Sequence, residues 1–233
     1  MELKNYFTSM NALRVMTDDL ISAIQAQKKE RSFHLALSGG GTAKQMFALW
    51  TTEYRDRIPW SRIRFHWVDE RCVRPDDNES NFGHARRQLF DPMHIANEQI
   101  FRIHGEDDPQ QEALRYEREV AVLPCRNGMA HFDAVILGVG PDLHTASIFP
   151  STKNLLTDQR LYAVSRHPES GQWRITMTGP FILNSTPLFV PILGKDKRDV
   201  VRRLREGYSA DNDFPATYIL SKAERATVYA SEL

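Results

Sequence analysis

The stretch over residues 132–150 constrains the fold of this chain more than any other. It opens with a short apolar run containing β-branched residues, which is typical of a strand buried on both faces of a parallel sheet. Two glycines and a proline end the run, and Asp142 and His144 follow at once. Because ligands bind beyond the carboxyl ends of the strands in open α/β sheets, we expect a reactive group where Asp142 and His144 stand.

Strand and helix patterns alternate along the rest of the chain. Apolar residues at three- and four-residue steps predict an amphipathic helix over residues 9–29, with a basic last turn. Further strands are predicted over residues 33–37, 63–68, 162–164, 174–178, 187–193, 218–220 and 227–229. Further helices are predicted after residue 42, over residues 82–90, from residue 109, and over residues 180–185 and 195–205. The alternation, without a visible boundary, predicts one α/β domain over residues 1–233, with a mostly parallel sheet and helices on both faces.

The composition limits the partners and the location that we expect. The 30 lysines and arginines balance 30 aspartates and glutamates, which argues against nucleic-acid binding but allows a local basic pocket. Cys72 and Cys125 have neither metal-binding nor disulfide spacing. No apolar run approaches the ~18 residues needed to cross a bilayer, and no secretion signal is visible. We therefore expect a cytoplasmic protein without a membrane or nucleic-acid partner.

A run of three glycines between two hydroxyl residues separates a predicted strand from a predicted helix. The run is Ser38, Gly39, Gly40, Gly41 and Thr42. Glycine lets backbone N–H groups approach an anion, and the helix N-terminus adds the positive end of its dipole. The run predicts a phosphate-binding loop, although a tight left-handed turn would use the same residues. ATP is not implied, because Lys44 is misplaced for a P-loop, and residues 138–143 lack the third glycine of a dinucleotide loop.

Charged side chains follow two of the predicted strands. A neutral imidazole suits His144 to removing a proton from water, and Asp142 would orient it or bind a substrate hydroxyl. A structural or exposed histidine is the plain alternative in a chain with eight of them. We expect no metal, because His144 has no partner at a metal-ligand spacing. Asp69, Glu70 and Arg71 close the second strand and are expected to face the same crevice, although a salt-bridged surface turn fits them equally well.

A basic run over residues 195–205 follows the predicted strand that ends at Gly194. Most of it is expected to form a solvated helix face, while one of its first lysines stands where an ammonium group can reach a ligand phosphate. A serine nucleophile is not indicated, because no GxSxG elbow occurs and Ser147 has no special setting in the sequence. The residues alone thus predict a protein that binds a phosphorylated small molecule and assists proton transfer through histidine.

Several of these segments, taken in order, resemble the 6-phosphogluconolactonases. The matching segments are LSGGGT at 37–42, WVDERCV at 67–73, ESNFG at 79–83, FD at 132–133, GxGPDxHTASIFP at 138–150, RIT at 174–176 and GxxK at 194–197. The resemblance spans the chain from the first helix to the last strands and implies a Rossmann-like fold shared with sugar-phosphate isomerases and deaminases. It also implies hydrolysis of 6-phosphoglucono-1,5-lactone to 6-phosphogluconate in the oxidative pentose phosphate pathway, without a cofactor or metal.

The resemblance also implies roles for individual residues. His144 would be the general base for the attacking water, with Asp142 acting on His144 or on the substrate. The groups implied to hold the phosphate are the loop of residues 38–42, Arg71 and Lys197. The residues expected to line the same crevice, without separate roles, are Asp69, Glu70 and Arg174. We expect a monomer or weak dimer whose partner is a small phosphorylated sugar lactone.

Leu143 departs from the family pattern, which usually has glycine between the acid and the histidine. If this position needs a positive φ, a leucine there costs roughly 1–2 kcal/mol. It would also crowd the substrate or displace His144. One alternative is therefore a non-catalytic sugar-phosphate-binding protein. Another is a glucosamine-6-phosphate deaminase/isomerase, but residues 145–150 lack the glutamate that supports ring opening in that family.

Overall fold

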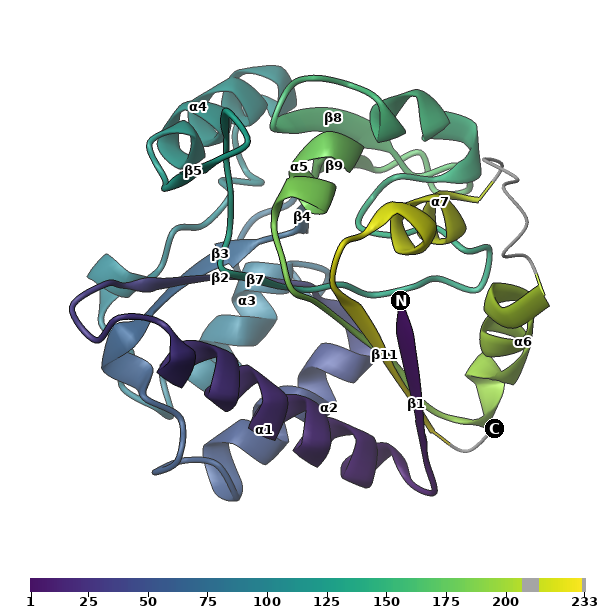
Figure 1. Cartoon of the computed structure of the whole chain (residues 1–233). Coiled ribbons are helices and arrows are strands. Elements are labelled where there is room, and N and C mark those ends of the chain that lie inside the picture. Colours follow the sequence, from purple (N-terminus) through teal and green to yellow (C-terminus); the bar gives the residue numbers. More distant parts are fainter. Residues whose placement is uncertain (207–213, 232–233) are drawn as a thin grey trace.

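A six-stranded parallel sheet forms the centre of the protein in a computed structural model that describes residues 1–206 and 214–231 (Figure 1). The strand order is β1-β11-β10-β7-β2-β3, and every pairing is parallel. The strands are β1 (Glu2–Tyr6), β2 (Phe33–Leu37), β3 (Ile63–Trp67), β7 (Ala134–Ile136), β10 (Leu188–Ile192) and β11 (Ala226–Ser231). The predicted α/β class and mostly parallel sheet are confirmed.

Helices cover both faces of this sheet, which explains why its inner strands are apolar throughout. All residues of β7 and β10 are buried. Figure 1 shows labelled helices on each side of the sheet. One group is α1 (Ser9–Ala26), α2 (Gly40–Thr52) and α3 (Asn81–Ala85), and the other is α5 (Gly179–Asn184) and α7 (Pro215–Lys222). The predicted apolar stripe of α1 is buried, but the predicted basic last turn is wrong, since α1 ends before Lys28 and Lys29.

A second, antiparallel sheet stands beside the central one and was not expected from the alternation of strands and helices. Its order is β4-β9-β8, and its strands are β4 (Asp69–Arg71), β8 (Tyr162–Arg166) and β9 (Trp173–Met177). Val68 joins the two sheets, because its N–H donates to Leu37 (2.9 Å) and its carbonyl accepts from Met177 (2.8 Å). The helix α4 (Pro109–Ala121) begins where predicted, with Asp108 as its N-cap, and packs on β8 and β9.

The structure corrects the prediction of a strand over residues 218–220. These residues lie in α7, which has Pro215 in its first turn and buries Ala216, Ile219 and Leu220 at helical spacing. No sequence pattern predicts β1, whose residues are all exposed or half-buried at the edge of the sheet. The pairing of β1 with β11 brings both ends of the chain into one sheet, so a single domain over residues 1–233 remains our proposal.

The remaining elements are short or peripheral. They comprise the hairpin strands β5 (Cys125–Arg126) and β6 (Met129–Ala130), the helix α6 (Arg198–Glu206), and helical turns at Trp60–Arg62, Arg86–Phe90, Asn97–Gln99, Pro150–Leu156 and Lys195–Lys197. The segment directly after His144 forms β-bridges through Thr145, and a helical turn begins at Pro150. Within the described part of the chain, no helix is both long and apolar enough to span a membrane.

Candidate active site

A cavity of about 510 Å³ lies beyond the carboxyl ends of β2, β7 and β10, and we call it the His144 cavity. The predicted site residues that line it are Ser38, Gly39, Gly40, Gly41, Thr42, Asp69, Arg71, His144, Arg174 and Lys197. Asn81, Ser147 and His167 line it as well, although the sequence reading gave them no role. Two predicted residues, Asp142 and Glu70, do not line it, and their positions explain what they do instead.

The glycine run forms a very short connection from β2 into α2. Only Ser38 and Gly39 lie between the two elements, and Gly39 is the N-cap, so the helix begins earlier than the predicted start after residue 42. The Ser38 hydroxyl donates to the carbonyl of Ile136 (2.8 Å) and accepts from the N–H of Gly138 (3.3 Å), which ties the end of β2 to the end of β7. The first N–H groups of α2 have no partner within the helix, and their residues line the cavity, so this end of α2 suits an anion.

The loop after β7 holds His144 in one orientation. Its Nδ1 lies 2.5 Å from Oδ1 of Asp142, and the N–H of Gly140 donates to the His144 carbonyl at 2.9 Å. A Cβ on Gly140 would lie 2.1 Å from Cε1 of His144, so only glycine leaves room for the ring. Since the carboxylate accepts, Nδ1 carries the proton, and the lone pair of Nε2 remains available as a base.

Asp142 is placed to orient His144. Burial alone would raise the pKa of the Asp142 carboxyl, but the charge of His144 and hydrogen bonds from His144 lower it below its ordinary value. Asp142 also accepts from the backbone N–H of His144 at 3.2 Å. Because Asp142 contacts His144 twice and is not among the residues that line the cavity, the geometry favours an effect on His144 over contact with a substrate hydroxyl.

Leu143 adopts the positive φ that the family glycine suggested, with a value of 62°. Its side chain nevertheless points into the hydrophobic core, where it is 1% exposed, and it does not line the cavity. Its carbonyl accepts from the N–H of Ala216 at the start of α7 (2.9 Å). Burying a leucine contributes ~1.5–3 kcal/mol, which offsets the roughly 1–2 kcal/mol cost of the backbone. Leu143 therefore neither crowds the cavity nor displaces His144.

The second sheet forms a polar wall of the cavity because its side chains alternate between two faces. Arg71 of β4 pairs with Arg174 of β9, and both line the cavity together with Asp69. The Asp69 carboxylate accepts from the Ser147 hydroxyl at 2.7 Å. Glu70 lies between the two other β4 residues in sequence and so points away from the cavity.

Glu70 corrects the expectation that all three residues of β4 face the same crevice. Its side chain is 2% exposed, and its carboxylate accepts N–H bonds from Arg71 (2.8 Å), Asn81 (2.8 Å) and Phe82 (2.7 Å), as well as the Ser80 hydroxyl (3.2 Å). Burial raises the pKa of Glu70 to about 7, although the three backbone donors favour its charged form. Glu70 therefore holds the start of α3 in place and does not contact a ligand in the cavity.

The cationic side chains of the cavity are incompletely paired. Arg174 is 8% exposed, and its Nε and the Nε of Arg71 are buried without a hydrogen-bond partner among the described residues. Burial, followed by the charge of Arg71, lowers the pKa of Arg174. Lys197 donates from Nζ to the carbonyl of Val139 (3.1 Å), which brings its ammonium group to the edge of the His144 loop. Neighbouring guanidinium groups with unused donors favour a bound anion.

Asn81 contributes to the site through its position beside the glycine loop. Its Nδ2 donates to the carbonyl of Asp69 (2.9 Å), which directs Oδ1 toward Gly39. A Cβ on Gly39 would lie 1.8 Å from this oxygen, so the close approach requires glycine. Asn81 belongs to the ESNFG segment of the resemblance, and that segment was the available signal for it. His167 had no such signal.

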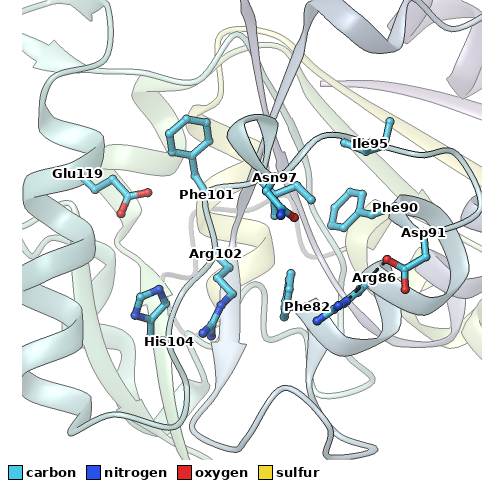
Figure 2. A pocket seen from close by; sticks show the side chains of 11 residues that line it. Phe82, Arg86, Phe90, Asp91, Ile95, Asn97, Phe101, Arg102, His104 and Glu119 are labelled. Atoms are coloured by element: carbon cyan, nitrogen blue, oxygen red, sulfur yellow. Dashed lines mark ion pairs between the residues drawn. The ribbon is translucent and has the colours of Figure 1, made fainter.

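A second cavity, of about 430 Å³, is lined by a different set of residues (Figure 2). We call it the Phe82 cavity. Phe82, Phe90 and Phe101 supply rings to its wall. Its arginines already have partners, since Arg86 lies 3.6 Å from Asp91 and Arg102 lies 2.6 Å from Glu106. No predicted site residue lines it.

Comparisons with known proteins identify the family. Residues 9–229 match the family model of glucosamine-6-phosphate isomerases/6-phosphogluconolactonase. The chain belongs to this family. It is 40% identical over 191 residues to a 6-phosphogluconolactonase of Haemophilus influenzae, with 81% of this chain and 80% of that protein covered. It is 38% identical over 190 residues to a 6-phosphogluconolactonase of Treponema pallidum, with 81% and 79% covered.

A solved structure supports the same assignment. The crystal structure of the devB protein matches with a TM-score of 0.90 at 35% identity, covering 99% of this chain and 95% of that one. These relatives confirm the predicted family, the Rossmann-like α/β fold, and the predicted class of enzyme, a 6-phosphogluconolactonase-type lactone hydrolase. The individual site residues are not tested by this likeness, so their roles are part of the proposal below.

Proposed function

We propose that the protein hydrolyses 6-phospho-D-glucono-1,5-lactone to 6-phosphogluconate, a step of the oxidative pentose phosphate pathway. The proposal depends on the Asp142–His144 pair, in which Oδ1 of Asp142 lies 2.5 Å from Nδ1 of His144. This pair stands at a cavity lined by three cationic side chains. A base next to an anion-binding cavity suits an ester whose phosphate lies away from the reacting carbon. The relatives named 6-phosphogluconolactonase support this substrate.

In the proposed mechanism, His144 acts as the general base. Its Nε2 takes a proton from a water molecule while the water oxygen bonds to the lactone carbonyl carbon. The bond from that carbon to the ring oxygen then breaks, and the ring oxygen takes the proton from His144. Asp142 holds the proton of Nδ1 in place and stabilises the imidazolium ion, and general-base help of this kind is worth ~10²–10⁴ in rate.

The remaining polar groups of the cavity are assigned to binding. The first turn of α2, Arg71, Arg174 and Lys197 would hold the phosphate, and this binding energy positions the carbonyl near His144. A covalent serine is not needed, because a lactone is an activated ester and the Ser147 hydroxyl is engaged by Asp69. The N–H of Gly140 donates to the His144 carbonyl, so it is not a free donor for a developing oxyanion.

Other expectations remain part of the proposal. The protein would act without a cofactor or metal, in the cytoplasm, as a monomer or weak dimer. The non-catalytic alternative depended on Leu143 damaging the site, and the buried position of that side chain removes its main support.

The test is hydrolysis of freshly generated 6-phosphogluconolactone, compared with its spontaneous rate. We expect the wild-type protein to accelerate the reaction and His144→Ala to lose ~10²–10⁴ of kcat. His104→Ala, which changes a histidine of the Phe82 cavity, is the matched control and should keep the wild-type rate. A wild-type protein that binds 6-phosphogluconate without hydrolysing the lactone would instead be a sugar-phosphate-binding protein.

A further inference from the structure

His167 lies in the His144 cavity although neither the sequence patterns nor the proposed mechanism gives it a role. It follows β8 at the start of the hairpin that leads into β9, and its N–H donates to the carbonyl of Gln172 at 2.9 Å. Gln172 stands two residues before Arg174, so the alternation of side chains places His167 on the polar face of the second sheet. His167 thus belongs to the same wall as Arg174.

A row of rings connects His167 to His144. The centroids of His144 and Phe149 are 4.8 Å apart, and those of Phe149 and His167 are 5.1 Å apart in an edge-to-face contact. Phe149 is 2% exposed, so this spacer is fixed by its surroundings. The row places His167 one ring beyond the proposed base, and both histidines line the same cavity.

The hydrogen bonds of His167 define its tautomer. Nδ1 accepts the backbone N–H groups of Glu169 (3.3 Å) and Ser170 (3.2 Å). A ring nitrogen that accepts carries no proton, so in the neutral ring the proton is on Nε2. His144 has the opposite arrangement, because its Nδ1 faces the Asp142 carboxylate. One histidine therefore presents a base to the cavity, and the other presents a donor.

We propose that His167 donates its Nε2–H to a hydroxyl of the sugar part of the substrate and is a specificity-determining residue. The proposal rests on the proposed function for the identity of that substrate. A hydroxyl is the better partner than the phosphate, because the cavity already offers Arg71, Arg174 and Lys197 to a dianion, while a neutral N–H matches a neutral oxygen. The turn that anchors Nδ1 fixes the donor before binding, which lowers the cost of ordering it.

Three substitutions separate this role from that of holding the turn. His167→Gln keeps an N–H donor near the position of Nε2, His167→Asn keeps an acceptor near the position of Nδ1, and His167→Phe keeps only the ring packing. We expect KM for the lactone to rise about tenfold in His167→Asn and His167→Phe, with a smaller change in kcat, and His167→Gln to restore most of it. The unfolding midpoints of the variants should rank differently from their KM values. His167→Asn should be closest to the wild type in stability, because it keeps the acceptor that holds the turn.

Calorimetric binding of 6-phosphogluconate to the same variants gives a readout that needs no turnover. The expected loss of affinity is again about tenfold in His167→Asn and His167→Phe. If the wild type hydrolyses the lactone but His167→Asn binds and reacts like the wild type, His167 only holds the turn and the proposal is overturned. If His167→Gln is as weak as His167→Phe, a donor near the position of Nε2 does not restore binding, and the proposal is overturned as well. A wild type that neither binds nor hydrolyses would overturn this proposal together with the proposed function.

Discussion

The His144 cavity and the Phe82 cavity are similar in size, about 510 and 430 Å³, and they contact consecutive residues of α3, Asn81 and Phe82. Both contain arginines, histidine and aromatic rings. They differ in how the polar groups are satisfied. Arg86 and Arg102 of the Phe82 cavity form ion pairs with neighbouring carboxylates, as Figure 2 shows for Arg86, whereas Nε of Arg71 and of Arg174 has no partner among the described residues.

The ability of a cavity to bind a ligand thus depends on which of its polar groups lack a partner within the protein. A paired guanidinium has already been compensated by its own carboxylate and gains little from a ligand. A buried guanidinium without a partner is unfavourable in the free protein, and an anion relieves it. The same reasoning applies to a possible metal site. His104, Asp107 and Glu112 bring potential ligand atoms within 4.8 Å of one another. The Glu112 carboxylate, however, already accepts hydrogen bonds from Arg115 and from the N–H of His104, so it has little left to offer a metal ion.

The largest effect on activity is expected from adding one methyl group to Gly140 in the His144 cavity. The Cβ would lie 2.1 Å from the His144 ring and would displace it, so we expect Gly140→Ala to lose at least ~10² of kcat. Gly138→Ala in the same loop is the control, since its Cβ would meet no other atom within 4 Å. Steady-state kinetics of both variants test this, and equal activity of the two would contradict the role given to the His144 orientation.

Removing one arginine from each cavity tests the pairing argument directly. Arg174→Met should raise KM for the lactone ~10–100-fold, because a hydrogen bond to a charged group is lost, and it should leave the unfolding midpoint unchanged or higher. Arg102→Met removes an arginine that is paired with Glu106 and should leave KM unchanged. Kinetics and thermal unfolding of the two variants provide the measurement. A fall in the midpoint of Arg174→Met without a change in KM would show that Arg174 is structural.

Glu70 of β4, which holds the start of the helix that contacts both cavities, gives a prediction about stability rather than activity: the free energy of unfolding should depend on pH. Its folded pKa is about 7, above the ordinary value of 4.5, so the folded state keeps its proton to higher pH than the unfolded state. The stability that Glu70 contributes is therefore full below about pH 4.5 and is lost as the pH rises through 7.

The measurement is the free energy of unfolding in denaturant at several pH values for the wild type and Glu70→Gln, which does not titrate. The difference between the two should fall by about 3 kcal/mol between pH 4.5 and pH 8. Glu98→Gln, at an exposed carboxylate, controls for the loss of a charge. A difference that instead grows with pH would mean that the three backbone donors outweigh burial.

The sequence predicted well those features that local patterns determine. The strand over residues 33–37 and the start of α4 after Asp108 are found as expected, because an apolar run and an Asp-Pro pair are local signals. The apolar residues 218–220 fit a strand or a helix equally well by their local pattern. The helix is favoured by Pro215 in its first turn and by burial of Ala216, Ile219 and Leu220. The polar strand β1 is stabilised by pairing with β11 at the other end of the chain.

The candidate site likewise contains residues that local patterns predict and residues that only long-range packing places. His144 and the glycine loop follow strands of the central sheet, so their meeting at one sheet edge could be predicted. Glu70 could not be separated from Asp69 and Arg71 until the antiparallel pairing of β4 with β9 gave each side chain a face. His167 enters the cavity only through the β8–β9 hairpin, and no local pattern encodes that long-range packing.

Leu143 has a consequence for the motion of the loop that carries His144. A glycine at this position would reach the left-handed backbone freely but would leave the loop without a side-chain anchor. The buried leucine fastens the loop to the core, and its carbonyl fastens it to the start of α7. The strained backbone at Leu143 is thus accompanied by two anchors that restrict the conformations of the loop carrying His144.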